Sequence, residues 1–458
     1  MKKIIKNKYI KKIIVAMSLV SVMSVTVPVD AAEIKNLDAR GAIVVEKNSG
    51  KILYGKNIDE VLGIASMSKM VTQYLILEAI HNGEVTWDTQ IPISPALSKM
   101  SINYELSNVP LRANVSYPLK DLYEAISIYS ANAAITAVGI YLGGSEDAWV
   151  QKMQETVESM GITDARLVNP SGLPYRYNIQ KNKNLSEDDE NSMSPRSVAI
   201  LAQRLITDYP EILDTASIQK KTFQPGTVDE TKMSNYNLLL PGLLFGRDDV
   251  IGLKTGTSAL SGASVTAVAI QNNTSVISVV VGSSAPLKRF EESSRLLDYI
   301  FTTYETIPFI KKGDSAQQIT PYPVVDGKDQ VITFDYDRDY YAAVPKGASP
   351  DQIIVEFTPN PERVNEENQI QAPITKGENL GYVTITTPGK DLGYLQEKDN
   401  TIPVVASYDV EEVGHLTKVW RQIKVFFAGI RDSIKDFFSG IFNSIKNFFH
   451  PSEEPATN

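Results

Sequence analysis

A serine and a lysine three residues apart, Ser66 and Lys69, open a stretch with helical spacing. Residues three apart on a helix share one face, so the hydroxyl and the amine can meet. A serine at a helix N-terminus also lies in a field that favours negative charge. A lysine in an apolar setting beside a second cation has a lowered pKa and can accept a proton. The pair therefore predicts a serine nucleophile activated without histidine.

Spacing alone does not define such a site, because Ser217 and Lys220 have the same separation and no chemical context. The informative feature is an ordered set, in which Ser66-x-x-Lys69 is followed by Ser130-x-Asn132 and then by Lys254-Thr255-Gly256. This order is the motif pattern of penicillin-binding proteins and serine β-lactamases.

The sequence resembles the low-molecular-mass D-alanyl-D-alanine carboxypeptidases (peptidase S11 type) within that group. The resemblance runs from about Asp38 to about Tyr304 and continues more weakly through the following β-rich region. It is supported by Asn169-Pro-Ser-Gly-Leu173 and by Ile251-Gly-Leu253 before Lys254. It implies an α+β fold, the penicillin-binding-protein/serine β-lactamase-like transpeptidase domain, with an antiparallel sheet covered by helices.

The resemblance also implies roles. Ser66 would attack the peptide carbonyl and Lys69 would accept its proton. Ser130 would relay a proton to the leaving amine, Asn132 would bind the substrate amide, and Lys254 would supply a positive field.

Two further roles follow from the resemblance. The backbone N–H groups of Ser66 and Thr257 would form an oxyanion hole, worth about 3–4 kcal/mol per donor. The substrate carboxylate would meet the residues Thr255, Gly256, Thr257 and Arg289. For Arg289 a plain surface arginine at a helix start is the alternative interpretation.

The expected reaction is removal of the terminal D-alanine from peptidoglycan stem pentapeptides, with β-lactams as covalent inhibitors. The histidines lie at expected helix ends and fit no Ser-His-Asp triad: His81, His415 and His450. No Cys/His cluster indicates a metal, and we expect no cofactor.

Two rival functions stay open. A β-lactamase shares the three motifs, and Glu187-Asp-Asp-Glu190-Asn191 loosely matches the Glu-x-x-Leu-Asn segment of class A enzymes, although its leucine is absent. The other rival is an inactive envelope-binding protein that keeps the motifs for folding. The intact Ser66, Lys69 and Lys254 weigh against it.

The elements that must position these residues follow from spacing and turn signals. Strands are expected at 41–46 and 51–54, and a meander at 250–256, 263–270 and 275–281. Helices are expected from Ser66 to about 81, over 118–141 with an interruption at 130–132, over 149–160, from 195, and over 289–304. A long polar loop is expected at 172–191. Helices between a hairpin and a meander favour one antiparallel sheet covered by helices.

The predicted domain order is a signal peptide (1–31), a carboxypeptidase domain (32–306), an all-β spacer domain (307–408), an amphipathic helix (415–450) and a polar tail (451–458). Prolines and short alternating runs mark the β domain, as at 330–336 and 352–358. The absence of cysteine means that an exported chain of this length must rely on its cores.

The N-terminal 31 residues combine six lysines with an apolar run and small residues before Ala32, which is typical of a secretory signal. An uncleaved anchor is the alternative. Removing this segment takes away the six lysines and Asp30 and changes the net charge from −9 to −14. So acidic a protein is not expected to bind nucleic acid.

Residues 416–449 repeat Phe, Ile, Val and Trp at helical spacing, and their charged residues sum to +4. The longest charge-free run, 437–445, is far short of the ~20 residues that span a bilayer. We expect a helix that lies in the membrane surface, which would hold an exported protein on the outer face of the cytoplasmic membrane, the cell-wall side. A coiled coil or a helix packed on the protein are the alternatives.

Overall fold

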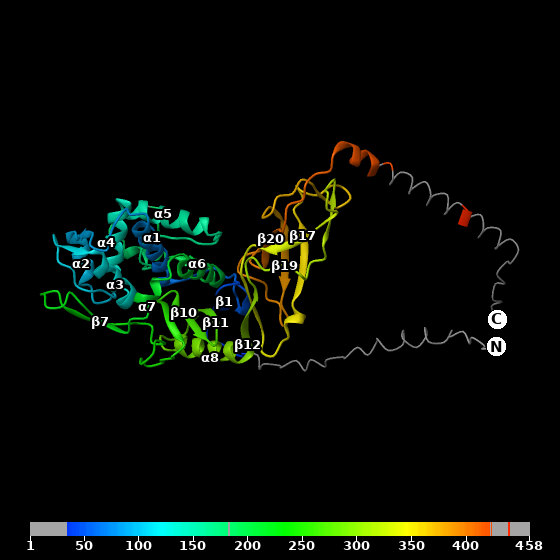
Figure 1. Ribbon diagram of the computed structural model, residues 1–458. Coiled ribbons are helices and arrows are strands. Elements are labelled where there is room, and N and C mark those ends of the chain that lie inside the picture. The colour runs from blue at the N-terminus through cyan, green and yellow to red at the C-terminus, as the bar shows by residue number, and fades with distance from the viewer. Residues whose placement is uncertain (1–33, 182–183, 422, 424–437, 440–458) are drawn as a thin grey trace, which may run out of the picture. The chain divides into compact units, whose positions relative to one another are not determined.

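The structure is a computed structural model that describes residues 34–181, 184–421, 423 and 438–439 (Figure 1). The predicted signal segment 1–31, most of the predicted tail helix and the polar tail 451–458 lie outside the described residues.

A five-stranded antiparallel sheet forms the centre of the N-terminal region, in the order β2-β1-β11-β10-β9. The predicted hairpin and the predicted meander are therefore joined edge to edge, because β1 pairs with β11 in the register Gly41↔Val281 to Glu46↔Val276. Every residue of β1 is buried, as expected for a strand covered on both faces. The strands are β1 (Gly41–Glu46), β2 (Ile52–Lys56), β9 (Val250–Ser258), β10 (Gly262–Gln271) and β11 (Thr274–Ser283).

Helices pack on this sheet and on one another (Figure 1). The helix α8 contacts β10 and β11, and α6 contacts β1, β10 and β11. The helices are α1 (Lys69–His81), α2 (Pro95–Ser101), α3 (Leu119–Tyr129), α4 (Asn132–Gly143), α5 (Glu146–Ser159), α6 (Pro195–Asp208), α7 (Ile212–Ala216) and α8 (Lys288–Thr303). The predicted helices and sheet strands are thus confirmed, with small shifts at their ends.

Two of these shifts concern the start of a helix. The stretch Ala65–Ser68 is a 3-10 helix, η2, and α1 begins only at Lys69. The helix α5 begins at Glu146, before the expected residue 149, because Ser145 caps it by accepting a hydrogen bond from the Ala148 N–H.

The helix α1 is buried without interruption from Lys69 to Leu77, so it is a central helix rather than an amphipathic surface one. Short two-stranded pairs complete the region: β3 (Leu62–Gly63) with β6 (Ser192–Met193), β4 (Gln90–Pro92) with β5 (Ser116–Pro118), and β7 (Lys220–Phe223) with β8 (Thr231–Ser234). The loop expected at 172–191 contains one 3-10 turn, η3 (Tyr175–Tyr177).

The C-terminal region is built from strands, as predicted. A four-stranded sheet has the order β15-β20-β19-β17, and β14-β13-β18 and β12-β16 form two smaller sheets. The strands are β12 (Tyr304–Ile310), β13 (Tyr322–Val325), β14 (Val331–Ile332), β15 (Phe334–Tyr336), β16 (Tyr340–Pro345), β17 (Ile354–Pro359), β18 (Ile370–Gln371), β19 (Asn379–Thr386) and β20 (Thr401–Ala406), with a 3-10 turn η4 at Pro350–Gln352.

The alternating run 330–336 forms two short strands in different sheets, β14 and β15, instead of one. Residues 415–421 are helical. Within the described part of the chain, no helix has the length and apolar character needed to cross a membrane.

Candidate active site

Ser66 lies in η2, partly exposed, while Lys69 begins α1 and is fully buried. The Lys69 Nζ lies 2.8 Å from the Ser66 Oγ, so the predicted contact forms across the boundary between the 3-10 and the α-helix. A partly exposed hydroxyl therefore lies next to a fully buried amine.

The Lys69 Nζ has two further neighbours, the Asn132 Oδ1 at 2.8 Å and the Ser171 carbonyl oxygen at 2.6 Å. Both are acceptors, and the orientation of the Asn132 amide is fixed because its Nδ2 donates to the Ser107 carbonyl. A neutral amine has two N–H groups and one lone pair. With both N–H groups taken by carbonyl oxygens, the lone pair is left for the Ser66 hydroxyl proton.

Burial lowers the pKa of Lys69 well below its usual value, and the positive charge of Lys254 lowers it further. Neither neighbouring oxygen carries a formal charge that would hold the proton on the amine. The site therefore favours the neutral amine, which is the form that a general base needs.

Ser130 and Lys254 form the second pair of the site. Ser130 ends α3 in the left-handed conformation (φ 54°), which separates α3 from α4 and explains the predicted interruption. The Lys254 Nζ donates to the Ser130 Oγ at 2.9 Å. Burial lowers the pKa of Lys254 to about 7, with a smaller contribution from the charge of Arg289.

Two glycines allow the segments of the site to approach one another. A Cβ on Gly256 would lie 2.6 Å from the Ile64 carbonyl oxygen, so β9 contacts the residues before Ser66 through bare backbone. A Cβ on Gly172 would lie 1.9 Å from the Ala65 carbonyl oxygen, and Gly172 also has a φ of +77°. Only glycine fits at these two positions without moving backbone.

Arg289, at the start of α8, is buried and points to the end of β9. It donates to the Gly256 carbonyl at 2.8 Å and to the Thr257 Oγ1 at 2.5 Å. Its pKa is lowered to about 10 by burial, and its Nε has no hydrogen-bond partner among the described residues. The structure therefore puts Arg289 beside Thr257, in contrast to the alternative interpretation of a surface arginine.

Sequence reasoning missed the contribution of the 169–173 turn to the base. The Asn169 Oδ1 accepts from the N–H and hydroxyl of Ser171 and from the Gly172 N–H, which folds this segment on itself. The turn fixes the Ser171 carbonyl that Lys69 contacts. The turn-forming run Asn-Pro-Ser-Gly is the feature of the sequence that indicates such a fold of the backbone.

The two glutamates of the β-lactamase alternative have other partners. Glu187 pairs with Lys181 at the surface, and the Glu190 Oε2 accepts from Ser258 and Ser261. Within the described residues, neither carboxylate is bonded to Ser66 or Lys69. Nothing in this geometry resembles a glutamate that activates water beside the nucleophile.

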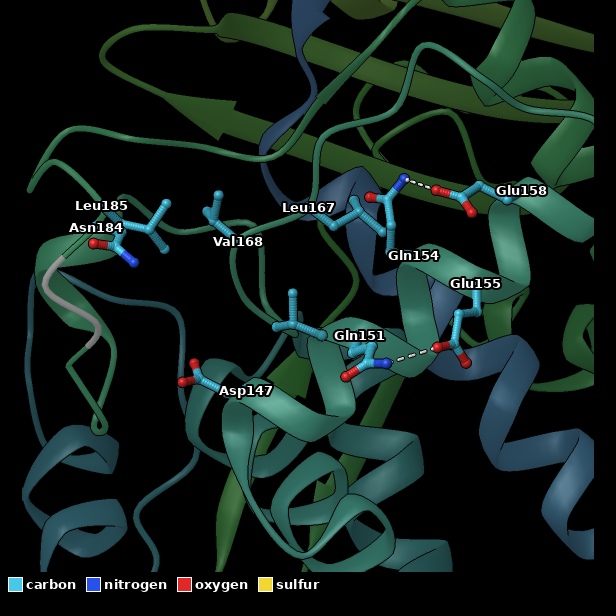
Figure 2. A pocket seen from close by; sticks show the side chains of 10 residues that line it. Asp147, Gln151, Gln154, Glu155, Glu158, Leu167, Val168, Asn184 and Leu185 are labelled. Carbon is cyan, nitrogen blue, oxygen red and sulfur yellow. Dashed lines mark hydrogen bonds between the residues drawn. The ribbon is translucent and has the colours of Figure 1, made fainter.

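A hollow of about 520 Å³ lies beside α5 and is the pocket of Figure 2. On its wall, Gln151 donates to Glu155 and Gln154 donates to Glu158. No residue of the three motifs lines it. The candidate active-site residues therefore lie outside this hollow.

The fold and the motif residues are those of a serine peptidase of the penicillin-binding-protein class. A family model described as D-alanyl-D-alanine carboxypeptidase matches residues 26–285, and one described as the C-terminal domain of penicillin-binding protein 5 matches residues 304–412. The chain therefore belongs to the D-alanyl-D-alanine carboxypeptidase family, and it is a serine-type enzyme of cell-wall metabolism. The predicted resemblance and fold class are confirmed.

Several relatives match along most of their length. The chain is 27% identical over 383 residues to the D-alanyl-D-alanine carboxypeptidase DacF of Bacillus subtilis, covering 83% of this chain and 88% of that protein. It is 26% identical over 406 residues to DacA of Escherichia coli K12, covering 86% and 89%.

Among solved structures, a peptidoglycan synthesis regulatory factor (PBP3) from Streptococcus pneumoniae is 31% identical, with a TM-score of 0.67 over 82% of this chain and 100% of that one. Penicillin-binding protein 5 from Haemophilus influenzae shares the fold, with 24% identity and a TM-score of 0.67 over 83% and 99%.

Proposed function

We propose that the enzyme removes the terminal D-alanine from peptidoglycan stem pentapeptides through an acyl-enzyme on Ser66. The observation that carries this proposal is the surrounding of Lys69. Two carbonyl oxygens and burial leave its Nζ a lone pair for the Ser66 hydroxyl, 2.8 Å away. This is the arrangement of an activated serine without histidine.

In the proposed acylation, the Ser66 Oγ forms a bond to the carbonyl carbon of the penultimate D-alanine while Lys69 takes the hydroxyl proton. The backbone N–H groups of Ser66 and Thr257 stabilise the oxyanion. The C–N bond then breaks, and Ser130 passes a proton to the leaving amine of the terminal D-alanine. Water hydrolyses the Ser66 ester in the second step.

The remaining polar groups bind and orient the substrate. Asn132 holds the substrate amide, and Lys254 keeps a positive field at Ser130. Thr255, Gly256 and Thr257 face the substrate carboxylate, with Arg289 behind them. The contacts of Arg289 with Gly256 and Thr257 support this assignment. A free carboxylate at the substrate end is what this group of cations and hydroxyls would recognise.

β-Lactams are the proposed covalent inhibitors, because they offer a strained amide and a carboxylate to the same groups. The chain carries no resident metal or cofactor in this mechanism, and every step uses its own side chains and water.

The proposed location is the outer face of the cytoplasmic membrane. Residues 1–31 would direct export, 32–306 would form the enzyme and 307–408 a spacer. Residues 416–449 would lie on the lipid surface. The support for this part is the sequence, together with the exposed apolar side chains of Leu416, Val419 and Trp420 in the described start of the tail.

Labelling with a fluorescent penicillin tests the nucleophile. We expect Ser66→Ala to abolish the label and Ser217→Ala, which has the same Ser-x-x-Lys spacing, to retain it. Label that persists on the Ser66 variant would exclude the assignment. Product analysis on a D-Ala-D-Ala pentapeptide beside β-lactam turnover separates the proposal from its rivals. Released D-alanine supports a carboxypeptidase, rapid β-lactam hydrolysis a β-lactamase, and neither product an inactive binding protein.

A further inference from the structure

Glu190 lies at the end of the 172–191 loop, and its carboxylate closes the turn that follows Thr257. The Glu190 Oε2 accepts from the Ser258 Oγ at 2.8 Å and from the Ser261 Oγ at 2.6 Å. The Ser261 N–H in turn donates to the Ser258 Oγ at 2.8 Å. One buried carboxylate oxygen thus fixes both ends of the β9–β10 turn.

The adjacent residue, Asn191, holds two other segments of the site. Its Oδ1 accepts from the Val168 N–H at 2.6 Å, and its Nδ2 donates to the Asn169 carbonyl at 2.8 Å. Its own carbonyl accepts from the Ile64 N–H at 3.0 Å. Asn191 therefore fixes both the turn whose Ser171 carbonyl contacts Lys69 and the residue that caps η2.

The packing around Glu190 leaves little room for adjustment. A Cβ on Gly63 would lie 2.2 Å from the Ser261 Oγ and 3.4 Å from the Glu190 Oε2. The turn after β9 is therefore packed directly against β3, the strand that leads to Ser66. A shift of either segment would change the spacing between them.

Burying this carboxylate is costly. Glu190 is only 8% exposed, and its Oε1 is buried with no hydrogen-bond partner among the described residues. An unsatisfied buried acceptor opposes stability, so contacts that merely hold two loops together do not account for it. A carboxylate oxygen can, however, accept hydrogen bonds from two hydroxyls at a single point, as the amide oxygen of a glutamine also can.

We propose that Glu190 is a positioning residue for the oxyanion hole, and that with Asn191 it holds together the segment before Ser66, the 168–173 turn and the end of β9. Glu190 sets the backbone of Thr257, one residue before Ser258, at the distance from Ser66 that the transition state requires. This inference rests on the proposed roles of Ser66 and Thr257. It goes beyond them because, among the described residues, Glu190 is hydrogen-bonded to neither Ser66 nor Lys69 and would act through Thr257.

The expected signature is a loss in kcat with little change in KM. Removing one oxyanion donor completely costs on the order of 10²–10³ in kcat. Because Glu190→Ala would displace the Thr257 donor without removing it, we expect a loss of about tenfold. Glu190→Gln keeps a side-chain oxygen that can accept from the serines and should restore most of the rate.

The test uses the full-length protein, with active sites counted by fluorescent penicillin so that unfolded molecules do not enter the rates. Glu187→Ala is the matched control, because Glu187 lies in the same loop and pairs with Lys181 at the surface. The second readout is the inhibition constant of a peptidyl boronic acid ending in a D-alanine analogue, which forms a tetrahedral adduct with the serine. We expect Glu190→Ala to weaken boronate binding about as much as it lowers kcat.

Two results would overturn the inference. One is a Glu190→Ala enzyme with wild-type kcat per active site; the other is a boronate affinity equal to that of Glu187→Ala. If Glu190→Ala folds poorly, Ser261→Ala takes its place, because it removes one of the two bonds to Glu190 and should show a smaller loss of the same kind. A wild-type enzyme that is not acylated on Ser66 would contradict the proposed function instead.

Discussion

At the scale of single residues, the site contains three basic side chains, and burial makes the charged form of each less favourable. Lys69, Lys254 and Arg289 are each 6% exposed or less, and the pKa of each is lowered. No carboxylate accompanies them among the hydrogen bonds described above. The cluster therefore favours a neutral Lys69 and attracts the carboxylate of a substrate.

The first prediction concerns Lys69 as a neutral base. Lys69→Arg keeps a cation but cannot lose its proton near neutral pH, because arginine titrates above ~12. We expect the acylation rate by penicillin to fall by a factor of about 10³ or more, since a general base contributes roughly 10²–10⁴ and the guanidinium is also larger. The control is Lys220→Arg, in the motif-like pair Ser217-x-x-Lys220, which should acylate normally. A Lys69→Arg enzyme that acylates near the wild-type rate would reduce Lys69 to a structural residue.

The second prediction concerns the charge of Arg289. Its positive charge helps to lower the pKa of Lys254 to about 7. In Arg289→Gln this repulsion is gone, so the pKa of Lys254 should rise. The proposed positive field requires protonated Lys254. The alkaline limb of the pH profile of the acylation rate should therefore move to higher pH, even if the maximum rate is lower. Lys288→Gln removes an exposed charge beside it and should leave the limb in place. A limb that stays or moves to lower pH in the Arg289 variant would contradict the assignment.

Which residues meet at the site could be predicted from side-chain types, but their supporting contacts could not. Ser66, Lys69, Ser130 and Lys254 carry their chemistry in side chains, and the structure brings them together. The Ser171 carbonyl has no such signature, because every residue has a backbone oxygen. Glu190 was considered only as a possible water-activating group. Its position between two serines depends on how β9 and the 172–191 loop meet in space.

At the scale of elements, periodicity and turn residues predicted most helices and strands, but not the helix type at the nucleophile. The apolar spacing of Met67, Met70 and Val71 fits an α-helix, yet Ala65–Ser68 is a 3-10 turn. The cause is tertiary. The backbones of Gly256 and Gly172 pack closely against the Ile64 and Ala65 backbone. Tertiary contacts of this kind override the α-helical preference of the local sequence.

The third prediction concerns the contact between α5 and the 172–191 loop. The Glu146 carboxylate, in the first turn of α5, accepts from the N–H groups of Ile179 and Gln180. Burial raises its pKa to about 7 against an unfolded value near 4.5. The folded protein therefore binds more protons between these values, and the stability present below about pH 4.5 is lost as the pH rises through 7. The loss is at most about 3.5 kcal/mol, from roughly 1.4 kcal/mol per pKa unit.

Glu146→Gln should remove this dependence while keeping an oxygen that accepts from both N–H groups. Urea unfolding of the two proteins between pH 5 and pH 8, a range chosen to bracket the pKa, should show the wild type losing stability relative to the variant as the pH rises. Glu155→Gln, which removes an exposed carboxylate further along the same helix, should run parallel to the wild type. Parallel curves for Glu146→Gln and the wild type would show that Glu146 is ionised throughout.

At the scale of the whole molecule, the sequence predicts that catalysis and membrane binding belong to separate parts of the chain. All nine proposed site residues lie before Tyr304, where β12 opens the all-β region. The start of the tail is tied to that region, because Lys418 pairs with Asp326 and Arg421 donates to the Gly327 carbonyl. Two of the six basic residues of the tail are thus engaged with the protein. The apolar positions therefore matter more for lipid binding than the formal charge of +4 suggests.

The last prediction tests the tail as the membrane anchor. Within the described residues 415–421, truncation after Gly414 removes the contacts that Lys418 and Arg421 make with the all-β region, and partly exposed contacts of this kind contribute little to folding. The shortened enzyme should therefore stay folded, cleave small D-Ala-D-Ala peptides at the full-length rate and no longer sediment with anionic vesicles. Replacing Phe426, Phe437 and Phe448 with Ser should release the full-length enzyme more completely than replacing Lys424 and Lys435 with Gln. Salt should weaken binding of the lysine variants less than that of the wild type, because screening acts on the charge term. If the truncated enzyme binds vesicles as well as the full-length one, the anchor lies elsewhere and the tail is a packing or partner element.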